Sequence, residues 1–322
     1  MREALFIKKN KDRWERIQHQ PADDADDMAR DFIQLVDDLA YAKTFYPTSG
    51  VTEYINNQAS RIYLGIYQRR KEENNRLTGF WKYELPMTIR KHHGVMLFSF
   101  IIFVLFFAIG FFSSANDPNF VREMLGDDYV DMTLDNIKDG NPLGVYQSGN
   151  PVIMWLGIMF NNITVSLIYF AKGIAFCFLS IFSLANEAAR IGAFDHMFFS
   201  HNLGTTAAMG VMIHGTLELT AIILACGAGI VMGKSFLFPG TIKRLDSLIR
   251  GAKDGVKIVV GLLPVFMVAA MFEGFVTRHY KMHPAINITI LAACGIFVVW
   301  YFVIYPILLH RRLSVQLNEE DV

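Results

Sequence analysis

Two titratable side chains stand one helical turn apart inside a long apolar run, in the stretch MIHGTLELT (residues 212–220). An ionisable group in a membrane span costs about 2.5–3.5 kcal/mol on insertion scales, so it must find a partner, contact water or be neutral. His214 and Glu218 can bind a metal ion, relay protons, or neutralise each other by pairing at i and i+4. All three chemistries remain open at this point.

Other polar residues fall within apolar runs at similar depths. At a rise of about 1.5 Å per residue, each lies at or outside the bilayer midplane, and together they occupy four consecutive predicted spans. Polar residues that are merely tolerated have no reason to agree in depth. We therefore predict one intramembrane polar site that opens outward, formed by Asn161, Asn162, Glu187, Arg190, His214, Glu218 and Glu273.

Simpler structural roles also fit parts of this set. Glu187 and Arg190 can pair at i and i+3 near the outer interface. Asn161 and Asn162 can form hydrogen bonds between helices.

The candidate metal ligands are His214, Glu218 and Glu273, because an imidazole and carboxylates suit zinc and similar ions. The string HGTLE is not the HExxH motif of zinc proteases, since it lacks the second His and the Glu that serves as general base. No Ser-His-Asp order, GxSxG motif, phosphate-binding loop or Rossmann fingerprint occurs. We therefore assign no catalytic residue and name no cofactor, and an enzyme is the less favoured interpretation.

Six runs are long and apolar enough to span a bilayer, which requires about 20 residues. They lie at about 94–114, 151–171, 173–193, 205–233, 256–277 and 285–309. The second and third could instead form one long tilted helix, which would leave five spans.

Basic residues decide between these alternatives, because cytoplasmic loops carry an excess of Lys and Arg. With six spans, the six basic residues of the loop 234–257 lie on the same side as Lys91, Lys172 and the tail at 310–312. The loop 115–150 on the other side holds two basic residues against seven acidic ones. We therefore predict six spans, with both termini cytoplasmic.

The elements that must position the polar site are all predicted to be helices. The predicted fold class is all-α, a polytopic membrane helix bundle with an N-terminal cytosolic helical domain. Before the spans, residues 28–39 repeat apolar side chains at helical spacing, and Ser49 is placed to cap the next helix. The predicted divisions are a cytosolic amphipathic helical domain (1–90), a transmembrane domain (91–312) and a short acidic tail (313–322).

Small residues in the fourth span favour close helix packing. Gly229 and Gly233 have GxxxG spacing, with Gly227 nearby, and such residues let helix backbones approach in lipid. This face could hold a homodimer or another helix of the same chain. The formal net charge of zero gives no case for nucleic-acid binding. The expected partners are membrane lipid and proteins that bind residues 1–90 and 234–257.

Several stretches together resemble the stage II sporulation protein M family of bacterial integral membrane proteins. They are DLAYAKTFYPTSGVTEYIN (38–56), IRKHHG (89–94), FAKGIAF (170–176), HGTLELTAIILACGAG (214–229) and FEGFVT (272–277). The resemblance implies a multi-pass protein of the bacterial cytoplasmic (inner) membrane. It also maps family motif positions onto His214, Gly215, Glu218, Glu273 and Gly274. The sporulation members resemble scaffolds that hold cell-wall-degrading enzymes during engulfment.

These observations rank three functions. The first is an integral membrane scaffold or assembly protein of the bacterial envelope that contains the intramembrane polar site. The alternatives are a transporter or channel that uses the His214, Glu218 and Glu273 cluster, and an intramembrane metal-dependent enzyme.

Overall fold

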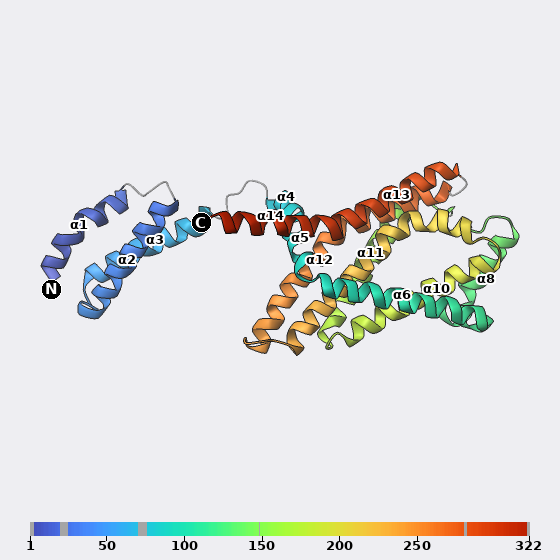
Figure 1. Cartoon of the computed structure of the whole chain (residues 1–322), viewed down its shortest axis with the longest axis horizontal. Helices are drawn as coiled ribbons and strands as arrows, with labels where there is room; N and C mark the ends of the chain where they lie inside the picture. Colours follow the sequence, from blue (N-terminus) through green and yellow to red (C-terminus); the bar gives the residue numbers. More distant parts are fainter. Residues whose placement is uncertain (1–2, 20–24, 70–75, 148, 280–281, 321–322) are drawn as a thin grey trace. The chain divides into compact units, whose positions relative to one another are not determined.

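The computed structural model describes residues 3–19, 25–69, 76–147, 149–279 and 282–320. Within these ranges the chain forms helices and no strand, which confirms the predicted all-α fold. The chain divides into two compact units, Met1–Leu77 and Thr78–Val322. Figure 1 shows the helices of both units along the chain.

The N-terminal unit contains α1 (Glu3–His19), α2 (Ala25–Phe45) and α3 (Gly50–Arg69). As predicted, Ser49 caps α3: its hydroxyl oxygen accepts a hydrogen bond of 3.2 Å from the backbone N–H of Val51. The three helices share a core of their own, because each has an apolar face. That core contains Phe6, Trp14, Ile17, Leu35, Ala42, Ile55 and Ala59.

The second unit begins within the short helix α4 (Arg76–Gly79), which η1 (Phe80–Glu84) and α5 (Leu85–Lys91) follow. The long apolar helices follow, joined by shorter elements. In chain order these are α6 (His93–Asn116), α7 (Pro118–Leu125), α8 (Asp127–Lys138), η2 (Gly144–Gln147), α9 (Pro151–Ala171), η3 (Lys172–Ile174), α10 (Phe178–Ser200), α11 (Gly204–Leu237), α12 (Arg244–Met271), η4 (Phe272–Val276), η5 (Thr277–His279), α13 (Pro284–Val299), η6 (Trp300–Ile304) and α14 (Tyr305–Glu320).

Five helices of the described chain are long and apolar enough to cross a membrane. They are His93–Asn116, Pro151–Ile174, Gly204–Leu237, Arg244–His279 and Pro284–Ser314. The predicted span at 173–193 is not among them, because its helix, α10, carries Glu187, Arg190 and Asp195.

Residues 151–193 do not form one long helix, so that alternative is wrong. The helix breaks after η3, where Phe176 and Cys177 adopt left-handed backbone angles with φ of 54° and 68°. The chain then turns back, and the Ser180 hydroxyl donates a 2.6 Å hydrogen bond to the carbonyl oxygen of Tyr169. This turn lets α10 leave α9 and pack elsewhere.

Small residues allow α10 to lie antiparallel against α6. A side chain added at Gly192 would collide with the carbonyl of Phe107, and one at Gly110 would collide with the backbone of Ala189. Backbones that come this close gain dispersion contacts which lipid chains cannot provide. Although α10 carries charges, it therefore runs beside an apolar span.

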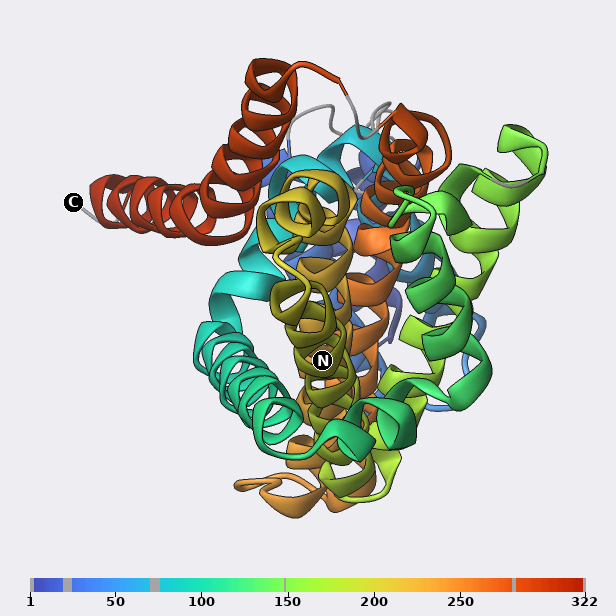
Figure 2. The ribbon, with the colours of Figure 1, turned by 90° about the vertical axis from the view of Figure 1, so that its right-hand side faces the viewer.

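The centre of the unit is the pair α11 and α12, which lie side by side in Figure 2. They are antiparallel, since Gly251 packs against Ser235 and Gly255 packs against Ala228. Of the five long apolar helices, α11 is the most buried. A polar side chain on α11 therefore faces protein on most sides.

The segment 234–257 is mostly helical, which corrects the prediction of a loop. Helix α11 continues to Leu237 and α12 begins at Arg244, so only 238–243 connects them. The reason is the spacing of Ser247, Gly251 and Gly255, which places small residues on one face at every fourth position. Arg244, Arg250 and Lys253 of the same segment are exposed.

The predicted loop 115–150 also contains two helices, α7 and α8. The Asp117 carboxylate caps α7 by accepting a 2.9 Å hydrogen bond from the backbone N–H of Asn119. Val121 and Val130 then pack against Met197 and Phe198 of α10. This connection is therefore a folded cover over one end of the bundle.

Candidate functional site

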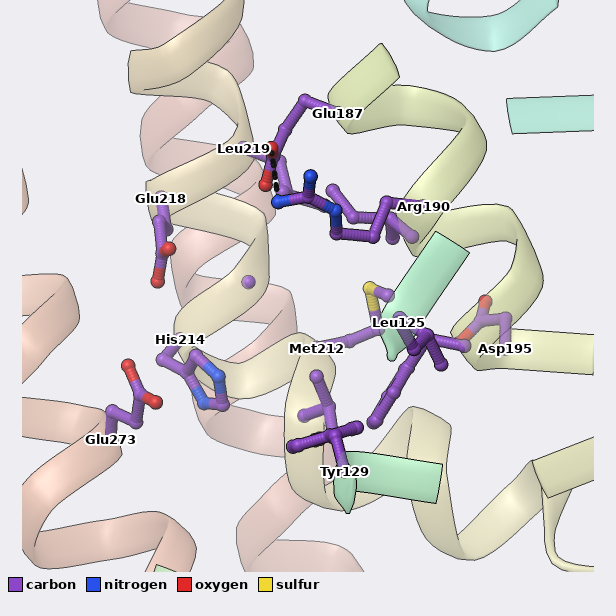
Figure 3. A pocket seen from close by; sticks show the side chains of 14 residues that line it. Leu125, Tyr129, Glu187, Arg190, Asp195, Met212, His214, Glu218, Leu219 and Glu273 are labelled. Carbon is purple, nitrogen blue, oxygen red and sulfur yellow. Dashed lines mark ion pairs between the residues drawn. The ribbon is translucent and has the colours of Figure 1, made fainter. Parts of the chain in front are cut away.

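Three ionisable side chains meet where α11 passes η4. His214 and Glu218 project from α11, and Glu273 projects toward them from the neighbouring helix (Figure 3). One ligand atom from each, an imidazole nitrogen or a carboxylate oxygen, lies within 4.8 Å of the others. His214 is buried, and the two carboxylates are partly buried. Residues 59 positions apart in sequence, counted from His214 to Glu273, thus form one cluster.

Local backbone geometry helps to place Glu273. It lies in the π-helical turn η4 that follows α12, and such wide turns redirect side chains and often occur at functional sites. Gly274 keeps this turn close to α9, because a side chain there would press on Pro151 and Trp155.

The imidazole of His214 is held by the end of the same helix that supplies Glu273. Its Nδ1 lies 2.9 Å from the Thr277 hydroxyl, which in turn donates a 3.3 Å hydrogen bond to the carbonyl oxygen of Gly210. In the tautomer that carries its proton on Nδ1, the imidazole donates to the Thr277 oxygen and keeps a lone pair on Nε2.

The cluster borders a cavity of about 320 Å³. Four of its lining residues are acidic, and two lining helices, α10 and α11, supply most of the wall. The lining includes Leu125, Tyr129, Glu187, Arg190, Ile191, Phe194, Asp195, Val211, Met212, His214, Gly215, Glu218, Leu219 and Glu273. Five of the seven residues predicted to converge therefore face one space.

Glu187 lies across the cavity from Glu273, where it has its own partners (Figure 3). Its carboxylate accepts a 3.1 Å hydrogen bond from the Tyr169 hydroxyl and lies 3.5 Å from the Arg190 guanidinium. The i, i+3 pair considered from the sequence is thus formed, and both residues also line the cavity.

Asn161 and Asn162 lie in different environments. Asn162 is buried, and its side-chain amide interacts with the Glu218 carboxylate. Asn161 is exposed, and its amide reaches only the Asn162 side-chain oxygen, at 3.4 Å. The structure therefore places Asn162 next to the cluster and Asn161 outside the cavity.

Four residues of the site were missed by the sequence interpretation: Leu125, Tyr129, Asp195 and Thr277. Leu125 and Tyr129 come from α7 and α8, which the sequence presented as a connection. Burial, and to a lesser degree the charge of Glu273, raises the pKa of Tyr129, so its phenol stays neutral. The apolar spacing within 118–134 was the available signal that this segment folds onto the bundle.

No Lys or Arg within the described part of the chain pairs with Glu218 or Glu273. Arg190, the cation of the cavity, pairs with Glu187. Two carboxylates therefore lie together beside an imidazole, a donor set that can hold a cation or share a proton.

The three predicted packing glycines contact helices of their own chain. A side chain at Gly227 would meet Met96 of α6, one at Gly229 would meet Ser180, and one at Gly233 would meet the backbone at Gly173. The GxxxG face is therefore occupied within the chain, and a homodimer would need another surface.

Two family models match the chain. One, described as Stage II sporulation protein M, matches residues 99–278, and the other, described as a domain of unknown function (DUF8413), matches residues 4–68. No curated protein and no solved structure matches. The first match spans more than half of the chain and covers α9 to α12 with the whole polar cluster. The chain therefore belongs to the stage II sporulation protein M family, and its apolar helices identify it as a membrane protein.

Proposed function

We propose that this protein is an integral membrane scaffold of the bacterial envelope, whose N-terminal unit binds protein partners. The observation that carries the proposal is the N-terminal unit itself, which has its own core. Its helix α2 exposes Ile33 and Val36 one turn apart, at 59% and 41% of their full surface. Paired exposed apolar side chains on a charged helix are typical of a protein-binding surface.

The proposed orientation places both termini in the cytoplasm of a bacterial inner membrane. Lys91 pairs with Asp254 at 2.7 Å, and Lys91, Cys177 and Lys234 line one pocket, so α6, α10, α11 and α12 share one end of the unit. His93, the first residue of α6, lies with its Nε2 3.3 Å from the carbonyl oxygen of Phe302, and α14 packs against α5, so the final helix also starts near that end. Basic residues gather there, as they do on cytoplasmic faces.

Cysteine labelling tests this orientation. The three native cysteines are buried, so new ones can be placed at the exposed Asn119 and Thr241. An impermeant maleimide added to intact cells should label Asn119→Cys and should label Thr241→Cys only after lysis. The reverse labelling pattern would contradict the proposed orientation.

Photo-crosslinking in cells tests the scaffold role. A benzophenone amino acid at Ile33 or Val36 of the full chain should give discrete crosslinked bands, identifiable by mass spectrometry. The same probe at Lys11, which is exposed on α1, serves as the control. Absence of protein crosslinks at both positions, or rapid solute flux by the purified protein in liposomes, would contradict the scaffold.

A further inference from the structure

We propose that His214, Glu218 and Glu273 form a binding site for one divalent transition-metal ion of the zinc class. The inference concerns a ligand of the membrane unit and does not depend on the scaffold role. Four independent features of the structure point to it.

The first feature is the donor set. One imidazole and two carboxylates are common ligands for zinc, whereas calcium and magnesium prefer oxygen alone. The three ligand atoms already lie within 4.8 Å of one another. Tetrahedral zinc with ligands at about 2.0–2.2 Å sets them about 3.4 Å apart, so small side-chain rotations complete the site.

The second feature is charge. Glu218 and Glu273 have no Lys or Arg partner in the described ranges, and they lie in a unit built from membrane helices. A divalent cation neutralises both carboxylates at once and compensates the cost of burying them.

The third feature is the orientation of the imidazole. Thr277 binds Nδ1 of His214 and is itself fixed by the carbonyl oxygen of Gly210. Metal-binding histidines commonly use one ring nitrogen for the metal and give the other N–H to a neighbouring acceptor. The hydrogen-bond chain from His214 to Gly210 has this arrangement.

The fourth feature is Asn162. Its buried side-chain amide interacts with the Glu218 carboxylate and so orients one of the proposed ligands. Carboxylates that bind metal ions are commonly held by such hydrogen bonds. The adjoining cavity can admit a water to the fourth coordination position.

The test measures metal in the full-length protein purified in detergent without chelator. Elemental analysis should find about one transition-metal ion per chain, as expected for a single mononuclear site. After stripping with a chelator, added Zn²⁺ should restore that content. His214→Ala, Glu218→Gln and Glu273→Gln should each lower zinc affinity by about 10-fold or more, as loss of a ligand requires.

Matched controls separate ligands from neighbours. Glu187→Gln removes a carboxylate from the same cavity, and His196→Ala removes an imidazole that instead contacts Phe111. Both should retain the metal. Wild-type protein that neither contains nor takes up Zn²⁺ overturns the site and favours a proton shared by the carboxylates. The proposed site is also overturned if the His214, Glu218 and Glu273 variants bind Zn²⁺ as tightly as the wild type.

X-ray absorption of the zinc-loaded wild-type protein decides the question if a variant fails to fold. One imidazole and two carboxylate ligands support the proposal, whereas a shell without imidazole overturns it. Neither this outcome nor the metal content bears on partner crosslinking, so failure of the metal site and failure of the scaffold role are distinguishable.

Discussion

Carboxylates at buried positions have different neighbours in the two units of the chain. In the N-terminal unit two acidic side chains beside the core face a base: Asp31 binds Arg16 at 2.6 Å, while Asp38 binds Arg13 and accepts a 2.8 Å hydrogen bond from the Trp14 indole. In the membrane unit, Glu218 and Glu273 face each other and His214. Opposite charges stabilise a fold without help, whereas gathered like charges need a cation or a proton.

This difference separates carboxylates that only stabilise the fold from carboxylates that indicate a ligand. The pairs of the N-terminal unit neutralise themselves within the chain, so they explain stability and suggest no ligand. The carboxylate pair of the membrane unit is costly without a cation or proton, and structures keep such arrangements mainly where they serve binding or chemistry.

The largest expected effect comes from breaking an opposite-charge pair of the N-terminal unit. Asp38→Ala leaves Arg13 and the Trp14 indole without their acceptor, so the unit should lose about 2–4 kcal/mol of unfolding free energy. Hydrogen exchange of α1–α3 in the full-length protein measures this loss. Asp37→Ala, at the exposed neighbouring position, should change the unfolding free energy little. Equal losses in Asp37→Ala and Asp38→Ala would show that the Asp38 pair contributes no special stability.

The same kind of change in the membrane unit should have the opposite sign when no metal is present. Glu218→Gln removes one of two adjacent like charges, so the metal-free protein should gain about 1 kcal/mol. Thermal unfolding in detergent with chelator measures it, with Glu123→Gln at an exposed position as control. With Zn²⁺ bound, the wild-type protein should be more stable than Glu218→Gln, because only the wild type keeps all three ligands. A destabilised metal-free variant would contradict this account.

An effect on zinc affinity alone should follow from loosening the imidazole. Thr277→Val keeps the shape of the side chain and removes the acceptor for Nδ1 of His214. Zinc affinity should fall by about 10-fold, the usual size for loss of a supporting hydrogen bond, while the metal content at saturation stays unchanged. Thr277→Ser should restore the affinity. An unchanged affinity in Thr277→Val would show that Thr277 does not position the ligand.

The smallest effect is expected at the exposed pairs of the cavity cover. Arg122 binds Asp127 at 3.0 Å and Asp131 at 2.7 Å, and its hydrogen bond lowers the pKa of Asp131. A lowered folded-state pKa contributes stability that is present above the unfolded pKa and is lost as pH falls through the folded value. Protection of α8 from hydrogen exchange should therefore fall in acid in wild type and depend less on pH in Arg122→Ala. Identical pH profiles would show that the pair contributes nothing measurable.

Local sequence patterns were sufficient for most of the long helices, but not for the helices within 115–150 and 234–257. Apolar runs located the membrane helices, Pro151 and Pro284 stand at the first positions of α9 and α13, and Ser49 marks the start of α3. Helix formation and membrane insertion depend on neighbours within a few turns, so a single chain is enough to predict them. The agreement in depth among the polar residues was likewise visible, because depth follows from position along a helix.

Only the tertiary structure decided which side chains meet. The rotation of α11 about its axis turns His214 and Glu218 toward η4, and Asn161 differs from Asn162 because consecutive helical residues point about 100° apart. Tyr129 and Thr277 join the site through packing between segments that are distant in sequence, which no local pattern encodes. The sequence thus determined that ionisable side chains lie within apolar runs and predicted a common depth for them. Packing determined which of them became neighbours, because contact depends on how helices turn and cross.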